Sequence, residues 1–390
     1  MRTVSVDQSL IKETKTSDVQ NSVKNWVTID LDALRHNIRC LRSSLSLGTE
    51  MLLIVKANAY GHGDKEIVGT AFQEGIRYFG VATIREAFEL RMQYPQVRLV
   101  ILDVNFPEDA DVIVENDLTP IIYTEEMAFA LNNSARQMNK ILSVHVKIDT
   151  GMGRIGCWHG DAPDFIKKLL QYDHLRIEGL CTHFAAAESN YEFSSTQWNA
   201  FKQVVDHFKE HGITFPFYHL ANSAGTFFLG LPYFNMVRIG IMAYGIMPRA
   251  EMKKIFDLKP VMSWWSKIIF VKPVVAGRPI GYGGTYITPH DTFIATIPIG
   301  YADGYMRALS NKGTVLINGK RYPVVGRISM DHIMVDLGTD SDISVGNDVL
   351  LFGTDGNYEL SCGEVAACAN TIPYELSCNA GRRGLRYYFY

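Results

Sequence analysis

The feature that most constrains the fold is a strand-like apolar segment that recurs eight times between residues 51 and 245. Most intervals hold a segment with helical spacing of apolar residues, such as residues 85–93, 162–171 and 195–212. The strand-like segments are continuously apolar, which is typical of parallel strands buried on both faces. They read MLLIVK, RYFGVAT, VRLVILDV, LTPIIYT, LSVHVKID, RIEGLCTHF, FYHLANS and MVRIGIMAYG.

Eight strand and helix units over about 220 residues are what a (β/α)8 barrel requires. The prediction is therefore an α/β fold with a TIM-like (β/α)8 barrel, which we expect over residues 33–255. A doubly wound parallel sheet is the alternative architecture, and the count of eight units favours the barrel.

A different pattern follows the eight units. After residue 255 the sequence is β-rich and punctuated by Gly, Asn-Gly and Pro, as in VMSWWSKIIFVKPV and GTVLING. This predicts a C-terminal all-β domain over residues 256–390. The earlier segment WVTIDL alternates like a strand, so residues 26–32 are expected to join that domain. Residues 1–25 are polar and are expected to form a disordered tail.

Charge and cysteine content exclude several classes of partner. The formal net charge is -3 and Lys and Arg occur without tracts, so nucleic acid is not an expected partner. The N-terminus holds no apolar stretch long enough for a signal peptide or a membrane span, so we expect a cytoplasmic protein without a membrane partner. Six cysteines occur without a CxxC pair or zinc-like His spacing, which predicts reduced packing residues and no metal site.

Candidate site residues are found at the ends of the apolar segments, because the active site of a barrel lies at the carboxyl ends of its strands. Polar residues or glycine follow five of the eight segments and are expected to converge on one mouth. They are Lys56, Tyr60, Lys147, Arg154, His183, His219, Asn222, Ser223, Arg238 and Gly240.

Lys56 is the most informative of these residues. A lysine at the end of a buried strand forms either a structural ion pair or a desolvated amine that can make a Schiff base, and position alone favours the ion pair. Its expected neighbours favour the second interpretation. Arg154 could hold a carboxylate with two hydrogen bonds, and a phosphate cradle is expected from Tyr60, Asn222, Ser223 and the backbone near Gly240 and Ile241. This combination predicts pyridoxal phosphate acting on an amino acid.

The segment GMGRIG at residues 151–156 also matches the G-x-G-x-x-G pattern of dinucleotide-binding loops. Gly160 and Pro163 follow it closely, so no helix is expected to begin at the third glycine. The next strand does not end in an acidic residue. A dinucleotide site is therefore not predicted.

Nine segments carry a resemblance to a known family. In order they are VKANAYGHG (55–63), VKIDTGMGRIG (146–156), THFAAAES (182–189), HLANSAG (219–225), VRIGIMAYG (237–245), GYGGTY (281–286), PIGYADGY (298–305), GRISMDH (326–332) and IPYE (372–375). Together they resemble alanine racemase, from residue 26 to residue 390.

The resemblance implies a two-base amino-acid racemase that uses pyridoxal 5'-phosphate. Lys56 would carry the cofactor and act as the base on one face of the substrate, and Tyr282 would be the base on the opposite face. Two bases are needed because a single base returns its proton to the same face. The family places Tyr282 in the active site of the other subunit, which implies a homodimer. His62 is assigned only to support of the turn after Lys56.

The resemblance also implies roles for cationic residues and one histidine. Arg238 would face the pyridine nitrogen of the cofactor and Arg154 would bind the substrate carboxylate. Lys147 matches a lysine that is often carbamylated to position that arginine. His183 would lie beside the ring and relay between Tyr282 and Arg238.

The remaining implied roles concern the phosphate and the entrance. Met330 would make a backbone contact to substrate across the interface, and the entry corridor would contain Tyr301, Arg327 and Asp331. The phosphate would be held by Tyr60, Asn222, Ser223, Gly240, Ile241 and Tyr374.

The expected substrate is alanine, supplying D-alanine for peptidoglycan, since Tyr374 would place an aromatic ring near a small side-chain pocket. Three alternatives stay open. A serine or broader amino-acid racemase of the same fold is one, because an apolar pocket rejects an added hydroxyl only weakly. A non-catalytic PLP-binding homeostasis protein is the second, although residues 256–390 weigh against it. A decarboxylase is the third and is disfavoured by Arg238.

Overall fold

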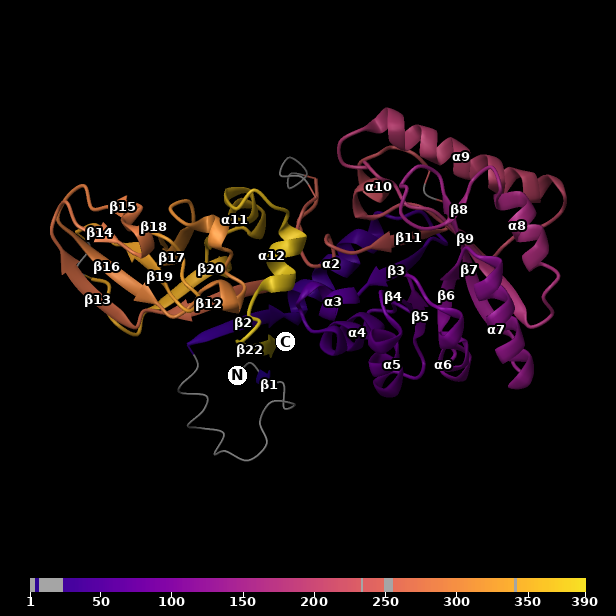
Figure 1. Ribbon diagram of the computed structural model, residues 1–390, viewed down its shortest axis with the longest axis horizontal. Coiled ribbons are helices and arrows are strands. Elements are labelled where there is room, and N and C mark those ends of the chain that lie inside the picture. The colour runs from indigo at the N-terminus through magenta and orange to yellow at the C-terminus, as the bar shows by residue number, and fades with distance from the viewer. Residues whose placement is uncertain (1–3, 7–23, 233, 249–254, 340–341) are drawn as a thin grey trace.

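The fold was analysed in a computed structural model, which describes residues 4–6, 24–232, 234–248, 255–339 and 342–390. Two parts lie side by side in Figure 1, a barrel with its surrounding helices and a β-rich part that follows it in sequence. No helix among the described residues is long and apolar enough to cross a membrane.

All eight strands of the predicted barrel are present and parallel, in the spatial order β10-β9-β7-β6-β5-β4-β3-β11. β11 pairs with β3, so the sheet curls back on itself and the doubly wound alternative is wrong. β6, β7 and β11 are buried along their whole length, as the continuous apolar segments predicted. The strands are β3 (Glu50–Ile54), β4 (Tyr78–Val81), β5 (Arg98–Ile101), β6 (Thr119–Ile122), β7 (Leu142–Asp149), β9 (Leu175–Cys181), β10 (Phe217–His219) and β11 (Met236–Ile239).

The barrel closes between β10 and β11. In the described chain no ladder pairs join these two strands, but the Arg238 N–H donates to the Ala221 carbonyl oxygen at 2.9 Å. The small strand β8 (Cys157–Trp158) lies against the end of β7. Closure therefore depends on single contacts at the seam instead of a continuous ladder.

Helices cover the outside of the barrel (Figure 1). Their starts are encoded locally: Asp30 caps α2, Asn190 caps α9, and Thr83 with Glu86 forms a capping box at α5. The helices are α2 (Leu31–Ser43), α3 (Lys56–Tyr60), α4 (Asp64–Gln73), α5 (Ile84–Gln93), α6 (Ala110–Glu115), α7 (Glu125–Gln137), α8 (Ala162–Leu169), α9 (Tyr191–Glu210) and α10 (Ser223–Phe227).

The second part is built on an eleven-stranded sheet with the order β1-β22-β2-β12-β20-β17-β18-β19-β16-β13 and β21 beside β20. β14 and β15 form a separate hairpin. The strands are β1 (Val4–Val6), β2 (Asn25–Asp30), β12 (Met262–Lys267), β13 (Phe270–Val274), β14 (Pro279–Ile280), β15 (Tyr286–Ile287), β16 (Thr292–Ile297), β17 (Thr314–Ile317), β18 (Lys320–Val325), β19 (Ile333–Asp336), β20 (Asp348–Asp355), β21 (Tyr358–Leu360) and β22 (Leu385–Phe389).

The N-terminal segment contributes to this sheet. β2 lies between β12 and β22, which supports assigning residues 26–32 to the same domain as residues 256–390. β1 pairs with β22, whereas residues 1–3 and 7–23 of the expected disordered tail lie outside the described residues.

The C-terminal part also contains helices, so an all-β domain was too simple an expectation. α11 (Cys362–Cys368) begins where the Ser361 side chain accepts a hydrogen bond from the Glu364 N–H, and α12 (Pro373–Asn379) begins with a proline. Both helices are too short to show a helical period in the sequence.

Asn37 joins α2 to the segment that leads from the barrel to the second sheet. Its fully buried side chain donates to the carbonyl oxygens of Ala243 at 3.0 Å and Lys259 at 2.8 Å. Its oxygen accepts from the Lys259 N–H at 2.8 Å. This one amide satisfies three backbone groups.

We expect N37A to lower the free energy of unfolding by about 3 kcal/mol, because buried backbone groups lose their partners. Urea denaturation of N37A, wild type and the matched surface variant N133A measures the effect. Among the described residues, the Asn133 side chain makes only an exposed hydrogen bond with Arg136, so N133A should stay close to wild type. Equal stability of N37A and N133A would contradict this role.

Candidate active site

A cavity of about 570 Å³ opens at the carboxyl ends of the barrel strands. Small-molecule pockets in proteins have volumes of about 300–1,000 Å³. His219, also expected at this mouth, does not line the cavity and instead binds Arg238. The cavity brings together eleven other predicted residues. They are Lys56, Tyr60, Lys147, Arg154, His183, Asn222, Ser223, Arg238, Gly240 and Ile241, together with Tyr374 from α12.

Lys56 enters the cavity from an unusual turn. Residues 57–60 have φ between 52° and 55°, a left-handed conformation that costs roughly 1–2 kcal/mol per non-glycine residue. The Gly61 N–H closes the turn on the Ala57 carbonyl oxygen at 3.0 Å. As a result, Lys56 and Tyr60 both line the same cavity.

The Lys56 amine has no hydrogen-bond or ion-pair partner among the described residues, so the structural ion pair considered from position alone is absent there. Burial lowers the pKa of Lys56, and the nearby Arg154 cation lowers it further. Both effects raise the fraction of neutral amine, which is the nucleophilic form.

The cavity is rich in positive charge. Lys56, Lys147, Arg154 and Arg238 line it, and among the described lining residues the one carboxylate is Glu188. An excess of cations in a partly enclosed cavity favours anionic ligands.

The GMGRIG loop, which carries Arg154, is wrapped around a carboxylate. Asp149 Oδ1 accepts from the N–H groups of Gly151 at 2.8 Å and Met152 at 2.9 Å, and Oδ2 accepts from Gly153 at 2.9 Å. β8 follows the loop instead of a helix. The glycine pattern thus encodes a carboxylate-centred turn and not a dinucleotide loop.

Lys147 supports the same loop from the barrel interior. Its amine donates to the carbonyl oxygens of Ile148 at 3.2 Å and Ile155 at 3.3 Å. Burial lowers the pKa of Lys147. The loop therefore has an anchor on each side of Arg154.

Arg238 is held at the ends of two neighbouring strands, β9 and β10. One terminal nitrogen donates to His219 Nδ1 at 2.7 Å and to the His219 carbonyl oxygen at 3.0 Å. The other donates to the carbonyl oxygens of Thr182 at 2.6 Å and Leu220 at 3.0 Å and to His183 Nδ1 at 2.9 Å. Its Nε makes no hydrogen bond to a described residue. Burial lowers the pKa of Arg238 to about 10, so it remains a cation at neutral pH.

Arg238 also fixes the tautomers of two histidines. A guanidinium cannot accept a hydrogen bond, so Nδ1 of His183 and of His219 must be the acceptor and Nε2 carries the hydrogen. The Nε2–H of His219 then donates to His145 Nδ1 at 2.8 Å. Burial, reinforced by Arg238, holds the pKa of both His183 and His219 well below the ordinary value. Both rings are therefore neutral.

Hydrogen-bond donors gather at the opposite end of the cavity. Asn222 caps α10 through the Gly225 N–H, and the Gly240 N–H lies 3.1 Å from Ser223 Oγ. A Cβ at Gly240 would lie 2.7 Å from the Tyr60 hydroxyl oxygen, so glycine is needed for that approach. Burial raises the pKa of Tyr60 and keeps its hydroxyl protonated as a donor.

The other five predicted residues lie in the second domain and do not line the cavity. Tyr282 is 71% exposed in a short turn between β14 and β15, at the end of this domain that is remote from the barrel (Figure 1). A Cβ at Gly283 would lie 2.7 Å from the Arg327 Nη1, so that guanidinium packs beside the Tyr282 turn.

Tyr301, Met330 and Asp331 form a second group on the same domain. The Ala302 N–H donates to the Met330 carbonyl oxygen at 3.2 Å, and Arg383 donates to Asp331 at 2.9 Å. The side chains of Tyr301 and Met330 are exposed. Within one chain, the predicted site residues therefore lie in two separate places, the barrel cavity and the second domain.

Sequence reasoning missed several residues that line the cavity, namely Leu102, Ile121, Cys181, Thr182, Glu188, Ile372 and Cys378. Two had a usable signal. Thr182 directly precedes His183 at a strand end, and Cys378 follows Tyr374 by one helical turn on α12. All six cysteines are free thiols, but Cys378 faces the cavity and is not a packing residue.

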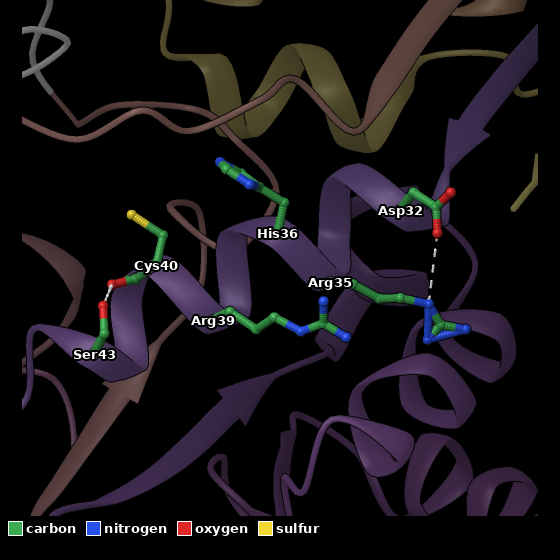
Figure 2. A pocket seen from close by; sticks show the side chains of 6 residues that line it. All are labelled: Asp32, Arg35, His36, Arg39, Cys40 and Ser43. Carbon is green, nitrogen blue, oxygen red and sulfur yellow. Dashed lines mark hydrogen bonds and ion pairs between the residues drawn. The ribbon is translucent and has the colours of Figure 1, made fainter.

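Another hollow of about 530 Å³ lies along the outer face of α2 (Figure 2). Its charged groups are already paired: Arg35 lies 3.7 Å from Asp32, and Arg39 binds both oxygens of Glu74 at 2.7 Å. With no converging unpaired groups, this face lacks the chemistry of the barrel cavity.

Comparisons with known proteins find relatives over most of the chain. The family model "Alanine racemase, N-terminal domain" matches residues 29–248, and "Alanine racemase, C-terminal domain" matches residues 261–388. An alanine racemase of Halothermothrix orenii is 39% identical over 364 residues, which are 93% of this chain and 96% of the relative.

Two solved structures extend the comparison. The alanine racemase of Clostridium difficile 630 has a TM-score of 0.87 and 36% identity and covers 94% of this chain and 96% of its own. The alanine racemase of Bartonella henselae with covalently bound pyridoxal phosphate has a TM-score of 0.82 and 32% identity, covering 94% and 99%.

We expect D149N to destabilise the protein by about 1–3 kcal/mol at neutral pH, because the loop loses its charged acceptor. Burial alone would raise the pKa of Asp149, but the N–H groups of Gly151, Gly153 and Met152 and the Lys147 cation outweigh it and lower the pKa. The stabilisation that the Asp149 carboxylate provides is therefore present above its unfolded-state pKa. It is lost as pH falls through its lower folded-state pKa.

Urea denaturation at a series of pH values measures this difference. The difference in free energy of unfolding between wild type and D149N should be constant near neutral pH and should become smaller in acid. The surface variant D164N, at a carboxylate 3.6 Å from Lys167, is the matched control and should show almost no gap. A gap that widens in acid would contradict the assignment.

Proposed function

The chain belongs to the alanine racemase family, and we propose that Lys56 and Tyr282 are the two bases of its reaction. It is an isomerase that interconverts L-alanine and D-alanine with pyridoxal 5'-phosphate as cofactor. The observation that carries the residue assignment is a partly buried, unpaired lysine among three other cations in one cavity.

The donor set of the cavity fits pyridoxal 5'-phosphate. We assign the aldehyde to the Lys56 amine, and the ring nitrogen to Arg238, whose Nε is unengaged by the described residues. The phosphate fits the hydroxyls of Tyr60, Tyr374 and Ser223, with Asn222 and the backbone at Gly240 and Ile241. When bound, the cofactor withdraws electrons from the substrate and makes its α-proton acidic.

Lys56 and Tyr282 divide the proton transfer between two faces of the α-carbon. The neutral Lys56 amine takes or returns the proton on one face. On the other face the Tyr282 hydroxyl of a second copy would return a proton, and its phenolate would take one, since inversion requires different faces for removal and return. His183, held neutral through its Nδ1 by Arg238, would relay between Arg238 and Tyr282 of the second copy.

Arg154 binds the carboxylate of alanine. A guanidinium matches a carboxylate with two parallel hydrogen bonds, and so orients the α-carbon between the bases. Lys147 positions Arg154 through the Ile155 carbonyl oxygen. The lowered pKa of Lys147 leaves more neutral amine, the form that carbon dioxide carbamylates.

Arg238 limits the cofactor's electron withdrawal. A guanidinium that stays protonated donates to the ring nitrogen and keeps a proton off it. An acid at this position would instead favour a protonated ring nitrogen. An arginine suits a reaction that needs only the removal and return of a proton.

A homodimer is proposed because one chain does not complete the site. Tyr282 is exposed and lies outside the cavity of its own chain. In the dimer, Met330 of the second copy contacts substrate, and Tyr301, Arg327 and Asp331 line the entrance. We further propose that the enzyme works in the cytoplasm and supplies D-alanine for peptidoglycan.

We expect Y282F to lower the turnover of alanine by roughly 10²–10⁴-fold, because one general acid-base group is removed. The visible band of the lysine-bound cofactor should be unchanged. In deuterated water, Y282F should exchange the α-proton of one enantiomer only, by Lys56 alone. Mass spectrometry of recovered alanine measures the exchange.

Y191F replaces an exposed tyrosine on α9 and is the matched control. It should behave as wild type. Undiminished turnover by Y282F, or equal exchange from both enantiomers, would remove Tyr282 from the proposed pair of bases.

We expect co-expression of K56A and Y282F to restore activity that neither variant has alone. A hybrid dimer places the intact Lys56 of one chain opposite the intact Tyr282 of the other, in one of its two sites. Random assembly should give about a quarter of the wild-type activity, since half of the dimers are hybrids with one working site each.

Separately tagged chains allow the hybrid to be purified before assay of L-alanine conversion. A purified hybrid without activity would show that each site uses its own Tyr282, and would overturn the shared site.

A further inference from the structure

The turn that presents Lys56 and Tyr60 needs external support. Left-handed backbone over residues 57–60 is unfavourable for alanine and tyrosine, and persists only where neighbouring groups hold it. Three consecutive carbonyl groups leave this turn, at Ala59, Tyr60 and Gly61. Two side chains outside the cavity bind all three.

His62 binds the first two carbonyl oxygens. Its Nδ1 lies 2.9 Å from the Ala59 oxygen and 3.1 Å from the Tyr60 oxygen. A carbonyl oxygen only accepts, so Nδ1 carries the hydrogen and Nε2 holds the lone pair. That Nε2 is buried and has no hydrogen-bond partner among the described residues.

Arg386 binds the third carbonyl oxygen. Its Nε donates to Gly61 at 2.8 Å. Arg386 belongs to β22, so the C-terminal strand reaches the turn directly. Tyr388 of the same strand packs against the turn's end, where a Cβ at Gly63 would lie 2.0 Å from its hydroxyl oxygen.

The surroundings of His62 keep it a fixed neutral donor. The ring is completely buried and stacks on Tyr244 with 4.4 Å between ring centroids. The Tyr244 hydroxyl donates to the Ile54 carbonyl oxygen at 2.7 Å, at the end of β3. Burial lowers the pKa of His62 to about 3, and its two carbonyl bonds and Arg386 have smaller effects. The group that faces it from β22 is Arg386.

We propose that His62 and Arg386 are positioning residues for the racemase reaction, which hold the left-handed turn so that the Lys56 amine and the Tyr60 hydroxyl reach the cofactor together. Neither side chain lines the cavity, so each acts only through the turn. This inference rests on the proposed roles of Lys56 and Tyr60.

Two amide substitutions at residue 62 separate this role from general packing. The side-chain nitrogen of Asn reaches about where Nδ1 lies in His, and that of Gln about where Nε2 lies. H62N therefore keeps a donor for the two carbonyl oxygens, and H62Q moves it to the position that has no partner.

We expect H62Q to raise the dissociation constant of pyridoxal 5'-phosphate by about tenfold, the effect of losing one buried hydrogen bond. H62N should stay within about twofold of wild type. Titration of the apoenzyme, followed by the visible band of the lysine-bound cofactor, measures this. In the cofactor-saturated enzymes, kcat for L-alanine should fall in H62Q with little change in KM, because Arg154 is untouched.

Controls make each outcome informative. H207Q changes another histidine with a buried, unpartnered Nε2, far along the chain on α9, and should match wild type. R386M tests the second donor if the changes at residue 62 impair folding, and should also raise the dissociation constant.

Borohydride reduction with peptide mapping separates the two proposals. If wild type is not labelled at Lys56, the proposed function fails at its first residue. If Lys56 is labelled but H62N and H62Q bind cofactor equally, or R386M binds as wild type, the positioning role is overturned and the two-base assignment stands.

Discussion

The buried guanidinium of Arg238 is the interaction on which the site and its scaffold both depend. It lies at the seam where β10 and β11 lack a ladder, and its backbone N–H bridges that seam to Ala221. Its side chain binds carbonyl oxygens that follow β9 and β10. The same residue therefore closes the barrel and presents a cation to the cavity, so in the proposed site barrel closure would fix the position of the cofactor's ring.

A second consequence concerns protonation. Arg238 itself stays charged, and it keeps His183 and His219 neutral because the guanidinium occupies the acceptor nitrogen of each histidine. In the proposed mechanism the acid-base chemistry is therefore concentrated in an amine, Lys56, and a phenol, Tyr282. Histidine, the usual general base at neutral pH, is confined to orienting its neighbours.

The eight-stranded barrel was predictable because strands that are buried on both faces have continuously apolar sequences. Lys56, Arg154 and Arg238 were predictable because strand ends converge. The left-handed turn was not, since alanine and tyrosine disfavour that conformation and Asn58 alone of its four residues tolerates it. Tertiary contacts such as that of Arg386 support it. The Asp149 turn was not predicted because its glycines match the pattern of dinucleotide-binding loops. Helices α11 and α12 were not predicted because seven residues are too few to show a helical period. Tyr282 was assigned by resemblance alone, since no local pattern relates it to Lys56.

β22 is synthesised after the segments that it contacts. Residues 25–30 and the Lys56 turn are synthesised early, but β2 gains its parallel neighbour, and Gly61 its Arg386 contact, only when residues 385–389 have been made. A nascent chain can assemble most of the barrel while its cofactor lysine still lacks that support. On the proposed role of Arg386, competence to hold the cofactor would be delayed until translation has supplied the strand that completes the other domain.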